Sequence, residues 1–315
     1  MTLDPDAARV IELANKSDKP PFEEVGAEEA RRLYLEGRRV LAPEPPLVNE
    51  IQDMEAPGPA GPIPIRYYRP IGALSQERLP VLVYFHGGGW VIGSLDSHDV
   101  VCRRLANAGR CAVVSVDYRM APEHKFPAAV DDCMAATEWV ARSGELLRID
   151  HARLAVGGDS AGGNLAAAVA LIARDAGTPA IAAQVLFYPA TDFDMSMPSH
   201  KTRGQSYLLT TRTMEWFRDQ YFRGPEDGAD WRASPIKASN VEGVAPAYVL
   251  TAGYDPLCDE GEAYARKLVE AGVMVTMRRY PGQIHGFLNM GKIIRAAGEA
   301  LDEAGRYLKG TAFAP

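Results

Sequence analysis

The segment Gly158–Gly162 (Gly-Asp-Ser-Ala-Gly) constrains the fold more than any other part of this 315-residue chain. The apolar run Leu154–Val156 precedes it, and Asn164–Arg174, a run typical of a helix, follows it. A strand, a sharp turn that carries one serine, and a helix together form a nucleophile elbow. Glycines at both ends of the turn leave room for a strained backbone. The pattern therefore predicts that Ser160 lies exposed at the end of a strand and at a helix N-terminus, where negative charge is favoured.

A second glycine-rich turn, His86–Trp90 (His-Gly-Gly-Gly-Trp), follows the apolar run Val81–Phe85. Three successive glycines leave backbone N–H groups unobstructed, as in loops that stabilise a negatively charged oxygen. A phosphate-binding loop would need lysine and then serine or threonine after its last glycine, whereas Gly163 and Asn164 follow Gly162. Nucleotide binding is therefore not expected.

A serine hydroxyl becomes a good nucleophile only when a base takes its proton, and the chain has six histidines. Of these, His285 fits the hydrolase order of serine, then acid, then histidine. The acid is expected between them, directly after a strand. Asp255 meets this condition because it follows the strand-like run Ala247–Thr251. Asp259 and Glu260, a few residues further on, remain alternatives.

Four parts of the chain together resemble the bacterial hormone-sensitive-lipase-like esterases of the α/β-hydrolase superfamily. They are His86–Trp90, Asp117–Ala129, Gly158–Asn164, and the pair of loops Tyr254–Glu260 and His285–Phe287. The resemblance covers the chain from about Val81 onward. It implies an α/β-hydrolase fold: a mostly parallel central sheet with helices on both faces and a helical cap. It also implies hydrolysis of short-to-medium-chain carboxylic esters without a metal ion or an organic cofactor.

For the site, the resemblance implies a catalytic triad of Ser160, Asp255 and His285, and an oxyanion hole formed by the N–H groups of Gly88, Gly89 and Ala161. One departure stands beside the acid, where Cys258 replaces the arginine that is more usual in the family. Because Cys258 would lie near a helix start, we expect its thiol to be reactive. Asp159, next to the serine, is expected to help pack the elbow.

The expected substrate pocket is apolar, as small-ligand sites usually are. Residues 192–230 interrupt the alternation of strands and helices and are rich in aromatic and apolar side chains. Most of these are expected to form the core of a cap. A few are expected to line the pocket, with the candidate lining residues being Trp90, Tyr188, Leu208 and Phe287.

Strand and helix signals alternate along the rest of the chain, which predicts a parallel sheet covered on both faces. We expect residues 1–46 to form an N-terminal helical cap segment and residues 192–230 a second one. Residues 47–191 and 231–315 would form the catalytic domain. The charged residues Asp117, Arg119, Glu123 and His124 are expected to form one buried cluster that braces the sheet beneath the glycine loop.

Composition limits the possible partners. The net charge of −7 argues against nucleic acid, no apolar run approaches the length of a membrane span, and the N-terminus has no secretory signal. The four cysteines are scattered, so we expect reduced thiols in a cytoplasmic protein, and no cluster of histidines and cysteines suggests a metal site.

The resemblance also suggests a homodimer. Alternative functions are an amidase, lactonase or lipase with the same triad and, more remotely, a non-catalytic ligand receptor.

Overall fold

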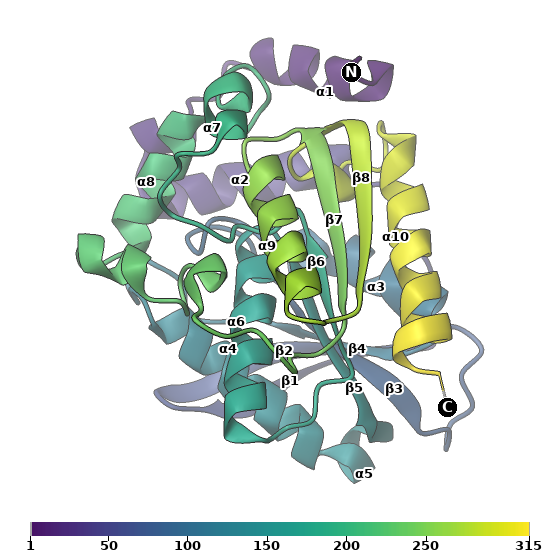
Figure 1. The fold of residues 1–315 in the computed structure, drawn as a ribbon. Coiled ribbons are helices and arrows are strands. Elements are labelled where there is room, and N and C mark those ends of the chain that lie inside the picture. The colour runs from purple at the N-terminus through teal and green to yellow at the C-terminus, as the bar shows by residue number, and fades with distance from the viewer. Residues whose placement is uncertain (1, 315) are drawn as a thin grey trace.

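The computed structural model describes residues 2–314, and a sheet of eight strands forms its centre (Figure 1). In chain order, the strands are β1 (Glu50–Gly58), β2 (Gly61–Arg69), β3 (Leu79–Phe85), β4 (Ala112–Val116), β5 (Ile149–Asp159), β6 (Ala183–Phe187), β7 (Ala247–Tyr254) and β8 (Val275–Ile284). Their order across the sheet is β1-β2-β4-β3-β5-β6-β7-β8. Strand β2 is antiparallel to β1 and β4, and every other neighbouring pair is parallel. The predicted α/β fold with a mostly parallel sheet is confirmed.

Helices cover both faces of this sheet, which is why its inner strands are continuous apolar runs. Every residue of β3, β4, β6 and β7 is buried. The helices on the two faces are α3 (Asp99–Gly109) and α10 (Arg295–Tyr307) on one side, and α4 (Ala128–Arg142), α6 (Ala161–Ala176) and α9 (Cys258–Glu270) on the other, with the short α5 (Gly144–Leu147) after α4. Within residues 2–314, no helix combines the length and the apolar character that crossing a membrane requires.

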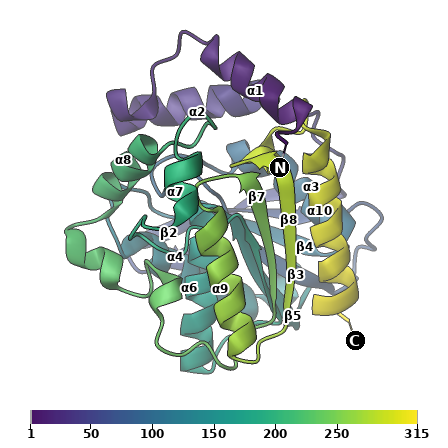
Figure 2. The ribbon, with the colours of Figure 1, turned by 45° about the horizontal axis from the view of Figure 1, so that its top comes forward.

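The N-terminal region contains two helices. These are α1 (Pro5–Asn15) and α2 (Ala27–Leu41). Pro20 and Pro21 lie between them and have no backbone N–H to donate, so only a short 3₁₀ turn, Phe22–Glu24, forms there. Figure 2 shows α1 and α2 lying across one end of the sheet.

The insertion at residues 192–230 contains α7 (Pro198–Arg203), α8 (Thr211–Tyr221) and a 3₁₀ turn, Pro225–Ala229. Helices α7 and α8 lie at the same end of the molecule as α1 and α2 (Figure 2). The N-terminal helices and the insertion both contribute to the walls of one large pocket, which also contains Ser160. The fold therefore places two segments that are far apart in sequence over one end of β5.

Candidate active site

The backbone at Ser160 is strained in the way that the sequence predicts for a nucleophile elbow. Its φ is 56° and its ψ is −118°, a conformation that residues other than glycine rarely adopt. A Cβ atom on Gly158 would lie 2.3 Å from the Phe85 carbonyl oxygen, and one on Gly162 would lie 1.9 Å from the same atom. Only glycine fits at these two positions because the turn presses directly against the end of β3. Ser160 is thereby held between the end of β5 and the first residue of α6.

The sheet brings Asp255 and His285 to this serine from the two strands that end beside it. Asp255 follows β7 and His285 follows β8. His285 Nε2 lies 2.9 Å from Ser160 Oγ, and His285 Nδ1 lies 2.7 Å from Asp255 Oδ2. When Nδ1–H donates to the carboxylate, Nε2 is left as an acceptor for the serine hydroxyl proton. This arrangement can activate Ser160 for attack on a carbonyl carbon.

The two alternative acids have other partners. Asp259 Oδ2 accepts a hydrogen bond of 2.8 Å from the Ser199 N–H. The Glu260 carboxylate is buried and accepts the N–H groups of Thr191 and Asp192, so it fixes the loop after β6. Burial raises the pKa of Glu260. Of the three candidate acids, the geometry therefore brings only Asp255 to His285.

The glycine loop lies directly over the serine. Gly88 and Gly89 line the same pocket as Ser160 and have φ values of 129° and 58°, which favour glycine. A Cβ atom on Gly89 would lie 2.2 Å from the Phe217 ring. Ala161 is the first residue of α6, so its N–H is among those that have no acceptor within the helix. These backbone groups are available to a negatively charged oxygen beside Ser160.

Asp159 joins the elbow to the glycine loop, in agreement with the packing role expected for it. Its carboxylate accepts hydrogen bonds from Tyr84 Oη at 2.7 Å and from the Gly87 N–H at 3.0 Å, and it lies 3.2 Å from His98 Nε2. Burial alone would raise the pKa of Asp159, but His98 and the two hydrogen bonds lower it to about 2. The ionised carboxylate thus ties together the two loops that form the site.

The single buried cluster expected around Asp117 does not form. Arg119 pairs with Asp132 at 2.7 Å. Glu123 pairs instead with Arg31 of α2, which ties this N-terminal helix to the segment after β4. Asp117 Oδ1 lies 3.7 Å from His86 Nε2 of the glycine loop, and His124 is exposed. The charged groups diverge because Arg119 faces α4, Glu123 faces α2 and Asp117 faces the glycine loop, relationships that sequence separation does not reveal.

The pocket over Ser160 has a volume of about 630 Å³ and mostly apolar walls. Trp90 and Leu208 line it, as expected, whereas Tyr188 and Phe287 are not part of its wall. The Tyr188 ring packs behind His285, with 4.9 Å between ring centroids, and Phe287 packs behind Tyr188 at 5.9 Å. These two rings support the histidine rather than face the cavity.

Sequence reasoning missed several residues of the wall. Those from the N-terminal region include Phe22, Tyr34 and Arg38, and those from the insertion include Phe193, Met214 and Phe217. The aromatic content of the insertion was a usable signal for the second group. No pattern in the first 46 residues indicates which side chains face the serine, because that depends on how α1 and α2 cross the sheet.

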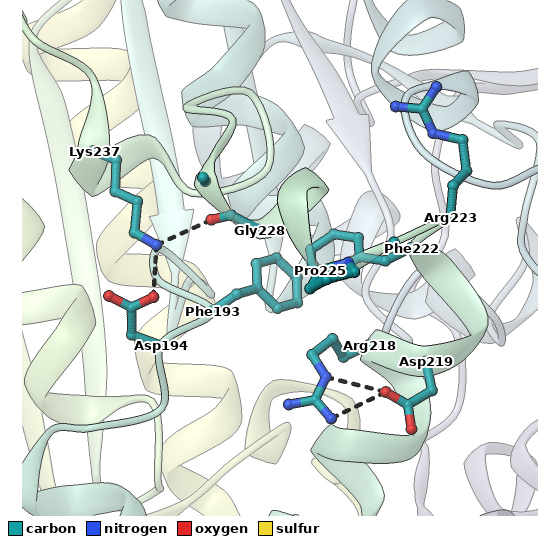
Figure 3. Close-up of a pocket in the computed structure, with 11 residues that line it drawn as sticks. Phe193, Asp194, Arg218, Asp219, Phe222, Arg223, Pro225, Gly228 and Lys237 are labelled. Atoms are coloured by element: carbon teal, nitrogen blue, oxygen red, sulfur yellow. Dashed lines mark hydrogen bonds and ion pairs between the residues drawn. The ribbon is translucent and has the colours of Figure 1, made fainter.

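A second cavity, of about 520 Å³, is lined by residues of the insertion and by Lys237 (Figure 3). Its three cations are paired: Arg218 with Asp219, Lys237 with Asp194, and Arg223 with Asp227. Phe193 lines both cavities. Because these cations are already paired, they attract an anionic ligand less strongly than unpaired cations would.

The expectation of a reactive Cys258 thiol is wrong. The side chain is buried at the start of α9, and burial raises its pKa to about 11 despite the neighbouring Arg279. Desolvation of the thiolate outweighs the favourable helix terminus. Cys258 therefore carries a protonated, protected thiol at neutral pH.

Comparison with known proteins agrees with this geometry. A family model described as alpha/beta hydrolase fold matches residues 82–289. The chain is 40% identical over 311 residues to an ethyl acetate hydrolase of Pseudomonas putida, covering 96% of each chain. It is 44% identical over 267 residues to the carboxylic ester hydrolase LipN of Mycobacterium tuberculosis, covering 83% of this chain and 70% of the relative.

Among solved structures, the ester hydrolase EH1AB1 from the Lake Arreo metagenome, determined with a derivative of bipyridine phosphonate, superposes with a TM-score of 0.94. That structure is 42% identical in sequence, and the match covers 98% of both chains. The chain belongs to the alpha/beta hydrolase fold family. Within that family, it is a carboxylic ester hydrolase of the hormone-sensitive-lipase-like group.

Proposed function

We propose that this protein hydrolyses short-to-medium-chain carboxylic esters through an acyl-enzyme formed on Ser160. The observation that carries the proposal is the hydrogen-bonded chain from Ser160 Oγ to His285 and on to the Asp255 carboxylate. Asp255 is completely buried. A buried carboxylate on Nδ1 holds the imidazole in the tautomer whose Nε2 can accept a proton, and it stabilises the imidazolium that forms.

The reaction proceeds in two halves. His285 takes the Ser160 proton as Oγ bonds to the ester carbonyl carbon, and the N–H groups of Gly88, Gly89 and Ala161 hold the resulting oxyanion. When the intermediate collapses, the bond from carbon to the alkyl oxygen breaks and His285 gives its proton to the departing alcohol. Water then attacks the acyl-enzyme, His285 takes a proton from it, and the acid leaves as Ser160 regains its proton.

The proposed preference for short-to-medium acyl chains is based on the size of the pocket and on the cap above it. Residues 1–46 and 192–230 act as two cap segments, and residues 47–191 and 231–315 as the catalytic domain. A volume of about 630 Å³ beneath a cap suits a small ester better than a long-chain lipid. The name of the Pseudomonas putida relative, an ethyl acetate hydrolase, points to small substrates as well.

The deciding experiment measures hydrolysis of p-nitrophenyl esters from acetate to palmitate, with Ser160→Ala tested in parallel. We expect activity on short and medium chains and its loss in Ser160→Ala. A preference for palmitate would favour a lipase, and faster turnover of amides or lactones would favour those activities. No turnover of any of these by the wild-type chain would favour a receptor, and activity that survives in Ser160→Ala would contradict the nucleophile assignment.

We also infer that the protein works in a reducing compartment, the cytoplasm, and that it forms a homodimer through the edge of its sheet. All four cysteines are free and buried, which suits a reducing environment. Strand β8 is an edge strand, and the exposed Met277 within it and Met274 just before it support pairing with a second copy.

A further inference from the structure

Arg38 brings a positive charge to the otherwise largely apolar wall of the pocket. Helix α2 carries three other arginines: Arg31 pairs with Glu123, Arg32 pairs with Glu29 and Glu36, and Arg39 is exposed to solvent. By contrast, Arg38 Nη1 is buried and has no hydrogen-bond partner among the described residues. A buried, charged donor without a partner is costly, and native structures usually satisfy such groups with protein, water or a ligand.

The contacts around Arg38 hold it in place without neutralising it. Its guanidinium carbon lies 4.5 Å from the centroid of the Tyr34 ring, which gives a cation–π contact. This contact supports the face of the guanidinium, and Nη1 keeps its N–H groups without a partner among the described residues. The second cation in the pocket wall, Lys19, already bonds to Glu36 at 3.1 Å. Arg38 is therefore the better placed of these two cations to receive an anionic group.

The carboxylates that share the pocket wall are occupied elsewhere. Asp159 is held by Tyr84, Gly87 and His98. Glu23 accepts a hydrogen bond from Thr213, and Asp192 lies 3.6 Å from Lys237. Since none of these contacts involves Arg38, a ligand carboxylate would not have to displace an existing ion pair.

The position of Arg38 relative to His285 indicates which half of the substrate it meets. A Cβ atom on Gly286 would lie 3.5 Å from Arg38 Nη2, so the guanidinium reaches the residue next to the catalytic histidine. His285 must give its proton to the leaving oxygen, so the alcohol half of the ester lies on its side of the site. Arg38 thus faces the alcohol half rather than the acyl half.

We infer that Arg38 is a specificity-determining residue that binds a carboxylate on the alcohol half of the ester, so that the preferred substrate class is O-acyl hydroxycarboxylic acids. This inference rests on the proposed function and deepens it. An arginine can bind a carboxylate through two parallel charge-assisted hydrogen bonds, which fixes orientation as well as adding affinity. The mostly apolar walls strengthen that interaction because they exclude water.

The test compares O-acetyl esters of glycolate, β-hydroxypropionate and γ-hydroxybutyrate with the same esters carrying a primary carboxamide in place of the carboxylate. The readout is the ratio of kcat/KM for each anionic ester to that for its neutral partner. We expect the wild-type ratio to exceed one for at least one chain length. In Arg38→Gln, that ratio should fall about 10- to 100-fold, mainly through KM. Arg38→Lys should retain part of the preference, and Arg39→Gln, on the exposed side of the same helix, should retain all of it.

A second readout does not depend on turnover. Calorimetry with Ser160→Ala should show O-acetyl-β-hydroxypropionate binding more tightly than its carboxamide, and the additional Arg38→Gln substitution should abolish the difference. The inference is overturned if Arg38→Gln slows both members of each pair equally. It is also overturned if only monoethyl succinate, which carries its carboxylate in the acyl half, responds to the substitution. Turnover of the neutral esters tests the proposed function separately, because it does not depend on the charge preference.

Discussion

Ser160, His285 and Asp255, the triad that we propose, illustrate how three ordinary side chains can become reactive through position. The serine hydroxyl is a poor nucleophile until His285 accepts its proton, and the histidine does so in the right tautomer only while Asp255 holds Nδ1. The distances of 2.9 Å and 2.7 Å link the three into one hydrogen-bonded unit. The chemistry thus depends on contacts among residues that lie up to 125 positions apart.

Replacing Asp255 with asparagine should lower kcat for p-nitrophenyl acetate by about 10³- to 10⁴-fold, because the amide no longer favours the productive tautomer of His285. Steady-state kinetics of purified Asp255→Asn would measure this. Asp259→Asn is the matched control, since Asp259 bonds to the Ser199 N–H and not to His285. If Asp259→Asn lost as much activity as Asp255→Asn, Asp255 would not be the residue that orients the base.

At the scale of single elements, the β5–α6 turn and the insertion at residues 192–230 obey different constraints. The turn is fixed by close backbone contact with β3, which leaves no space for a side chain at Gly158 or Gly162. The insertion packs through larger side chains, such as the Trp90 and Tyr221 rings stacked 4.6 Å apart. Substitutions in the turn should therefore disrupt folding, whereas substitutions in the insertion should change substrate specificity.

Gly162→Ala should destabilise the protein by about 3 kcal/mol or more, because the new methyl group would lie 1.9 Å from the Phe85 carbonyl oxygen. Thermal or urea unfolding would measure the loss. Gly310→Ala is the control: a Cβ atom at Gly310 would meet no other atom within 4 Å, so the effect should stay within about 0.5 kcal/mol. Equal stability of the two variants would show that the elbow tolerates movement away from β3.

Leu208→Ala should shift the preference toward bulkier esters, because it removes three carbon atoms from the pocket wall. Leu208 has a φ of 68°, and alanine bears a similar backbone strain there, so the change acts mainly on volume. A profile of kcat/KM against acyl-chain length would record the shift. Leu74→Ala, at an exposed position outside the pocket, should leave the profile as it is. An identical profile for Leu208→Ala would remove Leu208 from the specificity-determining wall.

The whole molecule has two sheet edges that differ in character. On β1, Ile51 is 39% exposed, but acidic residues surround it and Asp53 pairs with Arg66 of β2, which discourages pairing with another strand. On the β8 side, Met274 and Met277 are 70% and 41% exposed. Any association of two copies through the sheet is therefore expected at β8.

The double substitution Met274→Glu and Met277→Glu should convert a dimer into a monomer, because it places like charges in the apolar contact. Light scattering coupled to size-exclusion chromatography would measure the mass. The activity on p-nitrophenyl acetate should persist, since neither residue contributes to the pocket wall. A wild-type protein that is monomeric at micromolar concentration would contradict the proposed dimer.

Much of the site could be predicted from the sequence because the decisive geometry is local. The elbow and the glycine loop are each set by steric limits within a few residues, so Gly158, Gly162 and Gly88 indicate their structures directly. The alternation of apolar runs with helical segments gives the sheet, and the chain order of serine, acid and histidine follows from it. These features require no knowledge of which distant segments come into contact.

Only the tertiary structure decided the matters that depend on packing between distant segments. It distinguished Asp255 from the alternative acids Asp259 and Glu260, because only the Asp255 carboxylate contacts His285 and the other two carboxylates bond to different elements. It placed Tyr188 and Phe287 behind His285 and buried the Cys258 thiol, against expectation. It also brought Arg38 to Gly286, next to His285 and nearly 250 residues further along the chain. Burial and unpaired charge are properties of the assembled surface rather than of any sequence window, which is why the folded molecule alone reveals them.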